Sequence, residues 1–235
     1  MMLGARTGAW AKSVGWKNPY ITDGLIAMWD GVWNEAGGEP QNRELNYLND
    51  LSGLAGRATY SLGTIDRWDD YGPILHDKSY FTFDITDQMR DCNSSDWTLE
   101  LIADFTPDGK NAQPFCFGSW ITGLAGWRFE TLTSTYFACG TTQYRGPNAT
   151  SAQRVVFSRN VSTYSFEING SKVVATATGD TKTELVGGIG YWVQTYGGYS
   201  GTSGTFKSGR FYNRFLSPQE IAENYAVDKV RFNLP

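Results

Sequence analysis

Bulky apolar and polar residues alternate over short runs along most of this chain. The clearest run is 97–105, in which one set of alternate positions is apolar: Trp97, Leu99, Leu101, Ala103 and Phe105. A period of two places successive side chains on opposite faces of a strand. We therefore expect a strand here with one face in the core, and we assign Glu100 and Asp104 to a solvated outward face.

Similar runs recur between clusters of Gly, Pro, Asn and Thr, which is typical of short strands joined by turns. Besides 97–105, the expected strands are 24–31, 57–61, 79–83, 115–120, 126–132, 135–139, 154–159, 162–168, 171–178, 185–194 and 205–216. Asn169-Gly170 separates two of them and predicts a hairpin with a type I′ turn, because both residues accept positive φ angles. This pattern indicates an all-β protein, a two-sheet antiparallel β-sandwich or jelly roll.

A single helix is expected near the C-terminus, directly after the closing strand. Ser217 can cap it, Pro218 suits the first turn, and Glu220 completes a capping box. The helix should cover about 218–230 and latch the closing strand. Its predicted apolar stripe consists of Ile221, Ala222, Tyr225, Ala226 and Val230.

Residues 1–20 differ from the rest of the chain. They hold Trp10, Trp16, three basic residues and no acidic one, and no continuous apolar segment of a Sec signal peptide. Two interpretations stay open: a loosely ordered tail, or an arm that anchors the protein to a neighbouring subunit or a larger assembly through the two tryptophans. Residues 21–235 are expected to form one domain.

Composition narrows the possible partners. With 27 Gly, 13 Tyr, 13 Phe and 9 Trp, the chain suits aromatic-faced strands and glycine-bearing turns. A net charge of −4 argues against a nucleic-acid partner. Since no apolar run reaches the roughly 18 residues that span a bilayer, no membrane insertion is expected.

The cysteines and the histidine restrict the chemistry. Cys92, Cys116 and Cys139 are widely spaced, which fits buried thiols or one disulfide plus a free thiol, and not a zinc motif. The single histidine, His76, excludes a multi-histidine metal site and offers only one base for a Ser-His-Asp triad. No Gly-x-Ser-x-Gly elbow accompanies it.

Five segments in order carry a resemblance to a known family. They are Asp23–Gly31, Asp50–Gly53, Trp97–Asp108, Tyr164–Gly170 and Arg210–Ile221. Together they resemble the concanavalin A-like lectin and glucanase superfamily, and within it the laminin-G-like jelly-roll modules. Two positions depart from the family pattern: Leu48 stands where a tryptophan is expected, and His76-Asp77 stands where Asp-Gly is frequent. The resemblance implies a jelly roll that binds sugars or other proteins.

Enzymes of this superfamily that cleave glucans carry Glu-x-Asp-x-x-Glu on one strand, and this run is missing here. Retaining hydrolysis needs two carboxyl groups about 5 Å apart. Glu100 and Asp104 would lie about 13 Å apart at roughly 3.3 Å per residue. We therefore expect no catalytic activity.

Calcium is common at the rims of these modules, where carboxylates supply hard oxygen ligands. The acidic segment Asp66-Arg67-Trp68-Asp69-Asp70 is the best candidate, so a possible Ca²⁺ site is assigned to Asp66, Asp69 and Asp70. Arg67 would neutralise part of its charge.

Sugar recognition requires aromatic faces beside hydrogen-bonding groups. The candidates lie in or beside Gly- and Thr-rich segments: Trp120, Trp127, Tyr136, Tyr144, Tyr196 and Tyr199. Core packing is the competing interpretation for each of them. It is weakest for Tyr196 and Tyr199, because the glycines around them favour an exposed loop.

The function expected from the sequence is a non-catalytic, lectin-like module that recognises glycans or a protein surface. A protein made in the cytoplasm without a signal peptide meets cell-surface sugars if it belongs to a phage virion, as a decoration or host-attachment protein. The alternatives are a purely structural virion subunit without a ligand and a glycan-cleaving enzyme with an unrecognised site.

Overall fold

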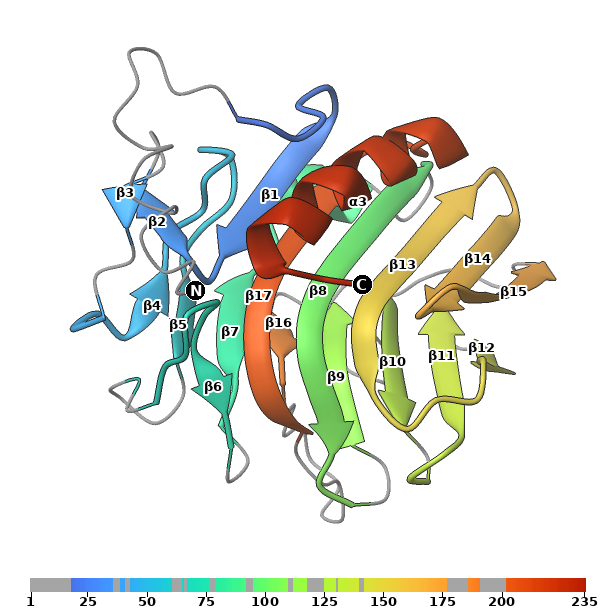
Figure 1. Cartoon of the computed structure of the whole chain (residues 1–235). Helices are drawn as coiled ribbons and strands as arrows, with labels where there is room; N and C mark the ends of the chain where they lie inside the picture. Colours follow the sequence, from blue (N-terminus) through green and yellow to red (C-terminus); the bar gives the residue numbers. More distant parts are fainter. Residues whose placement is uncertain are drawn as a thin grey trace.

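The structure is a computed structural model. It describes residues 18–35, 39–40, 43–60, 65, 67–76, 79–91, 95–109, 112–117, 125–129, 131–139, 142–176, 186–190 and 202–235. Two antiparallel sheets pack face to face, and one helix lies on the outside (Figure 1). The predicted all-β sandwich with a C-terminal helix is therefore confirmed.

The front sheet faces the viewer in Figure 1. In spatial order it contains β1 (Leu25–Asp30), β17 (Thr202–Tyr212), β8 (Trp97–Pro107), β13 (Ala152–Asn160), β14 (Thr163–Ile168) and β15 (Ser171–Thr176), and β6 (Ile74–Leu75) pairs with β17. The predicted opening and closing strands are thus hydrogen-bonded neighbours, β1 and β17.

The back sheet lies behind it. Its order is β12 (Thr142–Arg145), β11 (Thr135–Cys139), β10 (Ala125–Phe129), β9 (Ala112–Phe117), β16 (Val186–Ile189), β7 (Phe81–Asp84), β5 (Ala58–Tyr60) and β4 (Tyr47–Leu48). A separate ribbon consists of β2 (Trp33–Glu35) and β3 (Glu39–Pro40), and a one-turn helix, α2, covers Asp87–Asp91.

The predicted hairpin is confirmed between β14 and β15. Asn169 and Gly170 have φ angles of 50° and 83°, as a type I′ turn requires. The register pairs Ile168 with Ser171 directly across the turn.

Aromatic rings fill the space between the two sheets. Trp97 of β8 lies edge-on to Phe157 of β13, with 4.9 Å between ring centroids, and Trp29 of β1 lies 4.4 Å from Phe83 of β7. Leu48, which replaces the tryptophan expected from the family pattern, is fully buried in this core. The high aromatic content therefore supplies the apolar area that one core of this size needs.

The turn Asp50-Leu51-Ser52-Gly53 is organised by one carboxylate. Asp50 accepts hydrogen bonds from the backbone N–H groups of Met28, Ser52, Leu54 and Ala55, at 2.8 to 3.1 Å. Gly53 supplies a φ angle of +77°. An aspartate is needed here because only a short carboxylate can accept this many bonds from its own loop.

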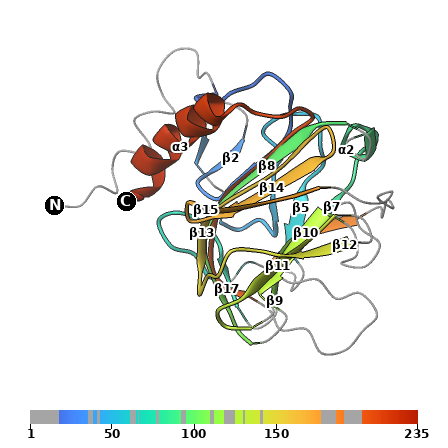
Figure 2. The same ribbon diagram turned by 90° about the vertical axis from the view of Figure 1, so that its right-hand side faces the viewer.

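Helix α3 (Pro218–Phe232) begins with the predicted capping box, formed by Ser217 and Glu220. It lies across the outer face of the front sheet, over β1, β17 and β8 (Figure 1), and Figure 2 shows it on the side away from β10, β11 and β12. None of the helices in the described part of the chain is long and apolar enough to cross a membrane.

The predicted apolar stripe of α3 is mostly wrong, although Ile221 is partly buried and packs against a hydrophobic cluster. Its buried residues are Asn224, Asp228 and Phe232, whereas Ala222, Ala226 and Val230 are exposed. The helix presents polar groups to the sheet because the strands beneath it present charged side chains, and a buried charge requires a polar partner.

Candidate functional site

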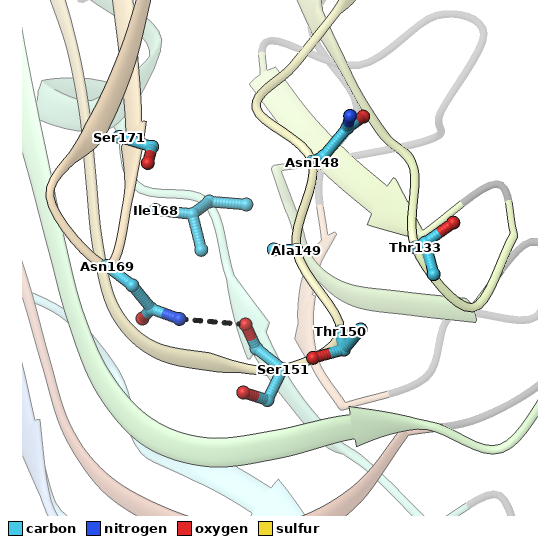
Figure 3. Close-up of a pocket in the computed structure, with 8 residues that line it drawn as sticks. All are labelled: Thr133, Asn148, Ala149, Thr150, Ser151, Ile168, Asn169 and Ser171. Atoms are coloured by element: carbon cyan, nitrogen blue, oxygen red, sulfur yellow. Dashed lines mark hydrogen bonds between the residues drawn. The ribbon is translucent and has the colours of Figure 1, made fainter.

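A polar pocket opens at the edge of the sandwich where the chain passes from the back sheet to the front sheet (Figure 3). Its volume is about 290 Å³, and its lining residues come from the β10–β11 loop, the connection before β13 and the β14–β15 turn: Thr133, Asn148, Ala149, Thr150, Ser151, Ile168, Asn169 and Ser171.

Asn169 holds the pocket wall together. Its Oδ1 accepts from the backbone N–H groups of Gln153 (2.9 Å) and Arg154 (3.1 Å), and its Nδ2 donates to the carbonyl of Ser151 (3.0 Å), the bond drawn in Figure 3. Because all three bonds go to the backbone, this side chain serves the shape of the pocket and is not available to a ligand.

Other polar groups of the pocket are available. Within the described part of the chain, the side chains of Asn148, Thr150 and Ser171 make no hydrogen bond. Hydroxyl and amide groups both donate and accept, so they suit an uncharged ligand rich in hydroxyl groups. The lining contains no titratable side chain, so it offers no acid or base for catalysis.

Two predicted sugar-binding aromatics face the core. Trp127 is fully buried and packs against Phe129 and Phe166. For this residue the competing interpretation, core packing, is the correct one. Tyr144 stacks on Phe137 at 5.2 Å, and its hydroxyl donates to the carbonyl of Thr176 at 2.7 Å, tying β12 to β15. Their rings therefore help to close the sandwich edge.

Tyr136 lies differently, on the outward face of the back sheet and partly exposed. It is the one predicted aromatic in the described part of the chain that lies on an outward face. Trp120, Tyr196 and Tyr199 lie outside the described residues, as do Trp10 and Trp16 of the N-terminal segment. Their assigned roles stay predictions.

Where the structure describes the acidic segment proposed for calcium, its Asp69 carboxylate accepts hydrogen bonds from the protein itself. Asp69 accepts from the backbone N–H groups of Tyr71 (2.7 Å) and Gly72 (2.9 Å) and also pairs with the hydroxyl of Thr205. Asp70 is exposed, and Asp66 lies outside the described residues. Across the described ranges, no three His, Cys, Asp or Glu side chains come together as a metal site would require.

Glu100 does not lie on a solvated face, so that prediction is wrong. It is only 3% exposed, because α3 covers this part of β8. Its carboxylate accepts from Arg210 Nε (3.1 Å) and Asn224 Nδ2 (2.6 Å). Burial raises the pKa of Glu100, and the nearby Arg210 guanidinium opposes that rise.

Glu100 belongs to a buried charged layer between α3 and the front sheet, which the sequence did not reveal. Arg210 is paired with Asp228 of α3, and Tyr20 donates to the same Asp228 carboxylate at 2.7 Å. Arg231 of α3 pairs with the buried Asp30 at the end of β1, at 2.8 Å. The layer fixes α3 in place and is closed to substrates.

The comparisons with known proteins concern the fold. No protein-family model matches this sequence, and no curated protein matches it. Solved structures do match. The Trypanosoma rangeli sialidase has a TM-score of 0.62 at 15% identity, over 88% of this chain and 33% of the sialidase chain. The same sialidase in complex with sialic acid has a TM-score of 0.61 at 14% identity, over 96% of this chain and 37% of the other.

A second group of similar structures belongs to botulinum neurotoxin type C. The botulinum neurotoxin serotype C1 binding domain has a TM-score of 0.59 at 10% identity, over 91% of this chain and 53% of the other. A further type C neurotoxin structure has a TM-score of 0.58 at 10% identity, over 89% of this chain and 52% of the other, and that toxin depends on two ganglioside molecules to enter cells. This chain spans about a third to a half of these structures, and at such identities the likeness shows a shared β-sandwich fold.

Proposed function

We propose that this chain is a non-catalytic carbohydrate-binding β-sandwich of the concanavalin A-like, laminin-G-like type. The observation that carries the proposal is the polar pocket of Figure 3, whose free hydroxyl and amide groups lie on a wall that Asn169 holds by hydrogen bonds to the backbone. Sugar hydroxyls need this mixture of donors and acceptors, and a preformed wall lowers the entropy cost of binding.

The similar structures support a glycan as the ligand. One is a sialidase in complex with sialic acid, and another is a toxin that depends on gangliosides. The five segments that resemble laminin-G-like modules also support a sugar ligand, because that resemblance implies binding of sugars or other proteins. A β-sandwich can also serve other purposes, so the pocket chemistry carries the argument, and the fold only agrees with it.

The non-catalytic part of the proposal is supported by the state of the strand carboxylate. Glu100 is buried beneath α3 and bonded to Arg210 and Asn224. A glycosidase acid or nucleophile must touch the scissile bond. Turnover of any polysaccharide in a broad panel would contradict this part of the proposal.

Binding to a panel of neutral and acidic glycans tests the proposed function. We expect wild-type protein to bind at least one glycan, and Ser171→Tyr to abolish that binding by filling the pocket. Thr150→Ala removes one hydroxyl and should weaken binding about tenfold or less, in line with one lost hydrogen bond. Val174→Thr on the exposed side of β15 serves as a control that should not change binding. Absence of binding to every glycan would favour the structural-subunit alternative.

The virion setting stays a prediction from the sequence. The same holds for the anchoring role of Trp10 and Trp16, which the structure does not describe. Deletion of residues 1–19, followed by measurement of particle incorporation and of mass in solution, tests both.

A further inference from the structure

Three side chains form a row across neighbouring strands of the back sheet. The backbone register pairs Arg128 of β10 with Tyr136 of β11, and Tyr136 with Arg145 of β12. Residues directly opposite each other on antiparallel strands share a face, with Cβ atoms about 5 Å apart. The row therefore consists of Arg128, Tyr136 and Arg145, in that order, and extends over roughly 10 Å of the sheet surface.

This row lies on the outward face. Trp127 and Phe137, each next to a member of the row along its strand, are fully buried in the core. Alternation along a strand then turns Arg128 and Tyr136 outward. Arg145 is exposed, and Arg128 and Tyr136 are partly exposed. The face is opposite to the one that α3 covers (Figure 2).

The row is positively charged in an otherwise acidic protein. Strands β9, β10, β11 and β12 contain two arginines and no Asp or Glu, although the chain as a whole carries −4. The guanidinium carbon of Arg128 lies 5.8 Å from the centroid of the Tyr136 ring, a cation–π contact that orients it toward the ring. Arg145 has no ion-pair partner among the described residues.

We propose that Arg128, Tyr136 and Arg145 bind the carboxylate-bearing unit of an acidic saccharide, an inference that rests on the proposed carbohydrate-binding function. The pyranose ring stacks on Tyr136, and its carboxylate accepts hydrogen bonds from the flanking guanidinium groups. Planar, fork-shaped arginine donors match a carboxylate in two parallel bonds. A tyrosine face supplies the apolar surface that the axial C–H groups of a sugar require.

The row also lies close to the polar pocket. Tyr136 is three residues from Thr133, and Arg145 is three residues from Asn148. Three residues span at most about 11 Å, which is about the length of two sugar units. One oligosaccharide can therefore contact both surfaces, with a neutral unit at the pocket and an acidic unit at the row.

Trigalacturonate and its fully methyl-esterified form provide matched probes, because esterification removes the charge and keeps the skeleton. Titration calorimetry at low salt should give the acidic form about tenfold tighter binding or more, as expected for charge-assisted bonds. Arg145→Gln should remove most of that preference. Arg145→Lys should keep part of the preference for the acidic form. The positive charge remains, but the two parallel hydrogen bonds of the guanidinium group are lost. Tyr136→Ala should weaken the binding of both probe forms, because both lose the stacking surface.

A matched control lies at the far edge of the same sheet. There Arg57 covers the ring of Tyr47 at 4.0 Å, so Arg57→Gln removes a similar surface arginine and should leave the preference unchanged. Equal binding of both probe forms by wild-type protein, or an unchanged preference in the Arg128→Gln/Arg145→Gln double variant, would overturn the proposal. Equal affinity for heparin fragments and duplex DNA would also overturn it, since it indicates a non-specific anion patch.

The failure of this inference is distinguishable from that of the proposed function. If neutral glycans bind and Ser171→Tyr abolishes that binding, the carbohydrate-binding function holds even where the acidic preference is missing. If no glycan of either kind binds, the proposed function fails together with the inference.

Discussion

Arg210 and Asp228 form a fully buried, two-bonded ion pair, with Nη1 to Oδ1 at 2.9 Å and Nη2 to Oδ2 at 2.6 Å. Arg210 comes from β17 and Asp228 from α3, so the pair joins the closing strand to the helix. Tyr20 adds a third bond to the same carboxylate and lies under the Arg210 guanidinium at 4.0 Å. The helix is held by directed polar contacts as well as by apolar burial.

Asp228→Asn should lower the free energy of unfolding by about 3–5 kcal/mol, because it leaves the Arg210 charge buried and poorly compensated. Glu100→Gln should lower the free energy of unfolding much less, by about 1 kcal/mol. Burial raises the pKa of Glu100, so its charge is already disfavoured, and a glutamine oxygen can still accept from Arg210. Urea unfolding of both variants measures the difference.

Asp23→Asn is the control for this comparison. Asp23 also pairs with an arginine, Arg214, at 2.9 Å, but its side chain is 85% exposed. Exposed pairs contribute about 0–1 kcal/mol, so this variant should unfold nearly as the wild type does. Equal losses in Asp228→Asn and Glu100→Gln would contradict the assignment of Asp228 as the main counter-charge.

The capping box should give the protein a pH-dependent contribution to stability. Hydrogen bonds from Arg214 and from Ser217 lower the pKa of Glu220 to about 2. A carboxyl group whose folded-state pKa is depressed stabilises the fold above its unfolded pKa, near 4.3, and loses that contribution as the pH falls toward the folded value. Since the side chain is partly exposed, the contribution should be about 1 kcal/mol or less.

Unfolding of the wild type and of Glu220→Gln, measured from pH 7 down to pH 3, tests this expectation. The difference between the two proteins should shrink steadily below about pH 4.3. Glu223→Gln, three residues beyond the box on the same helix, should show no such trend. A difference between wild type and Glu220→Gln that stays constant over this range would contradict the role given to the charge.

Gly31 is required by the close approach of three backbone segments. A Cβ atom there would lie 2.6 Å from the carbonyl oxygens of both Phe206 and Tyr71, and neither backbone can move without disturbing its sheet or turn. Gly31→Ala should therefore cost about 2–3 kcal/mol, as overpacking does. At Gly56 nothing lies within 4 Å of the added atom, so Gly56→Ala should unfold close to the wild-type midpoint. Similar midpoints for the two variants would show that the Gly31 contact relaxes freely.

The strands and the α3 cap were predictable because their signals are local. Period-two alternation marks β8, the Asn169-Gly170 pair marks a hairpin, and Ser217 with Glu220 marks the helix start. Each depends on residues a few positions apart, so the sequence shows it directly.

The buried charged layer was not predictable in the same way. Glu100 was assigned to solvent because its strand alternates cleanly, and α3 was expected to bury its alanines. Asp228 and Arg210 are 18 positions apart in sequence, and only the packing of α3 on β17 brings them together. The signal that the sequence does contain is one pair of opposite charges, Glu100 and Arg210, at outward positions of two strands that the register places side by side.

The pocket and the arginine row also depend on the fold. Thr133, Asn148 and Ser171 come from three separate connections, and no spacing in the sequence relates them. Tyr136 and Tyr144 look alike by composition, yet one faces outward and the other stacks on Phe137. Their strand register decides which of the two can meet a ligand.

Tyr196 and Tyr199 remain the aromatic pair that the sequence favours for sugar stacking. Their flanking glycines predict an exposed loop directly before β17. Replacing both by Ala should weaken binding of the glycan found in the panel by about tenfold or more, because a sugar face loses its stacking surface. Tyr225→Ala on α3 is a suitable control, since Tyr225 lies on the outer face of the front sheet against Arg154 at 4.5 Å. If the double variant binds as the wild type does while Tyr136→Ala does not, the outward face of the back sheet is the stacking surface instead.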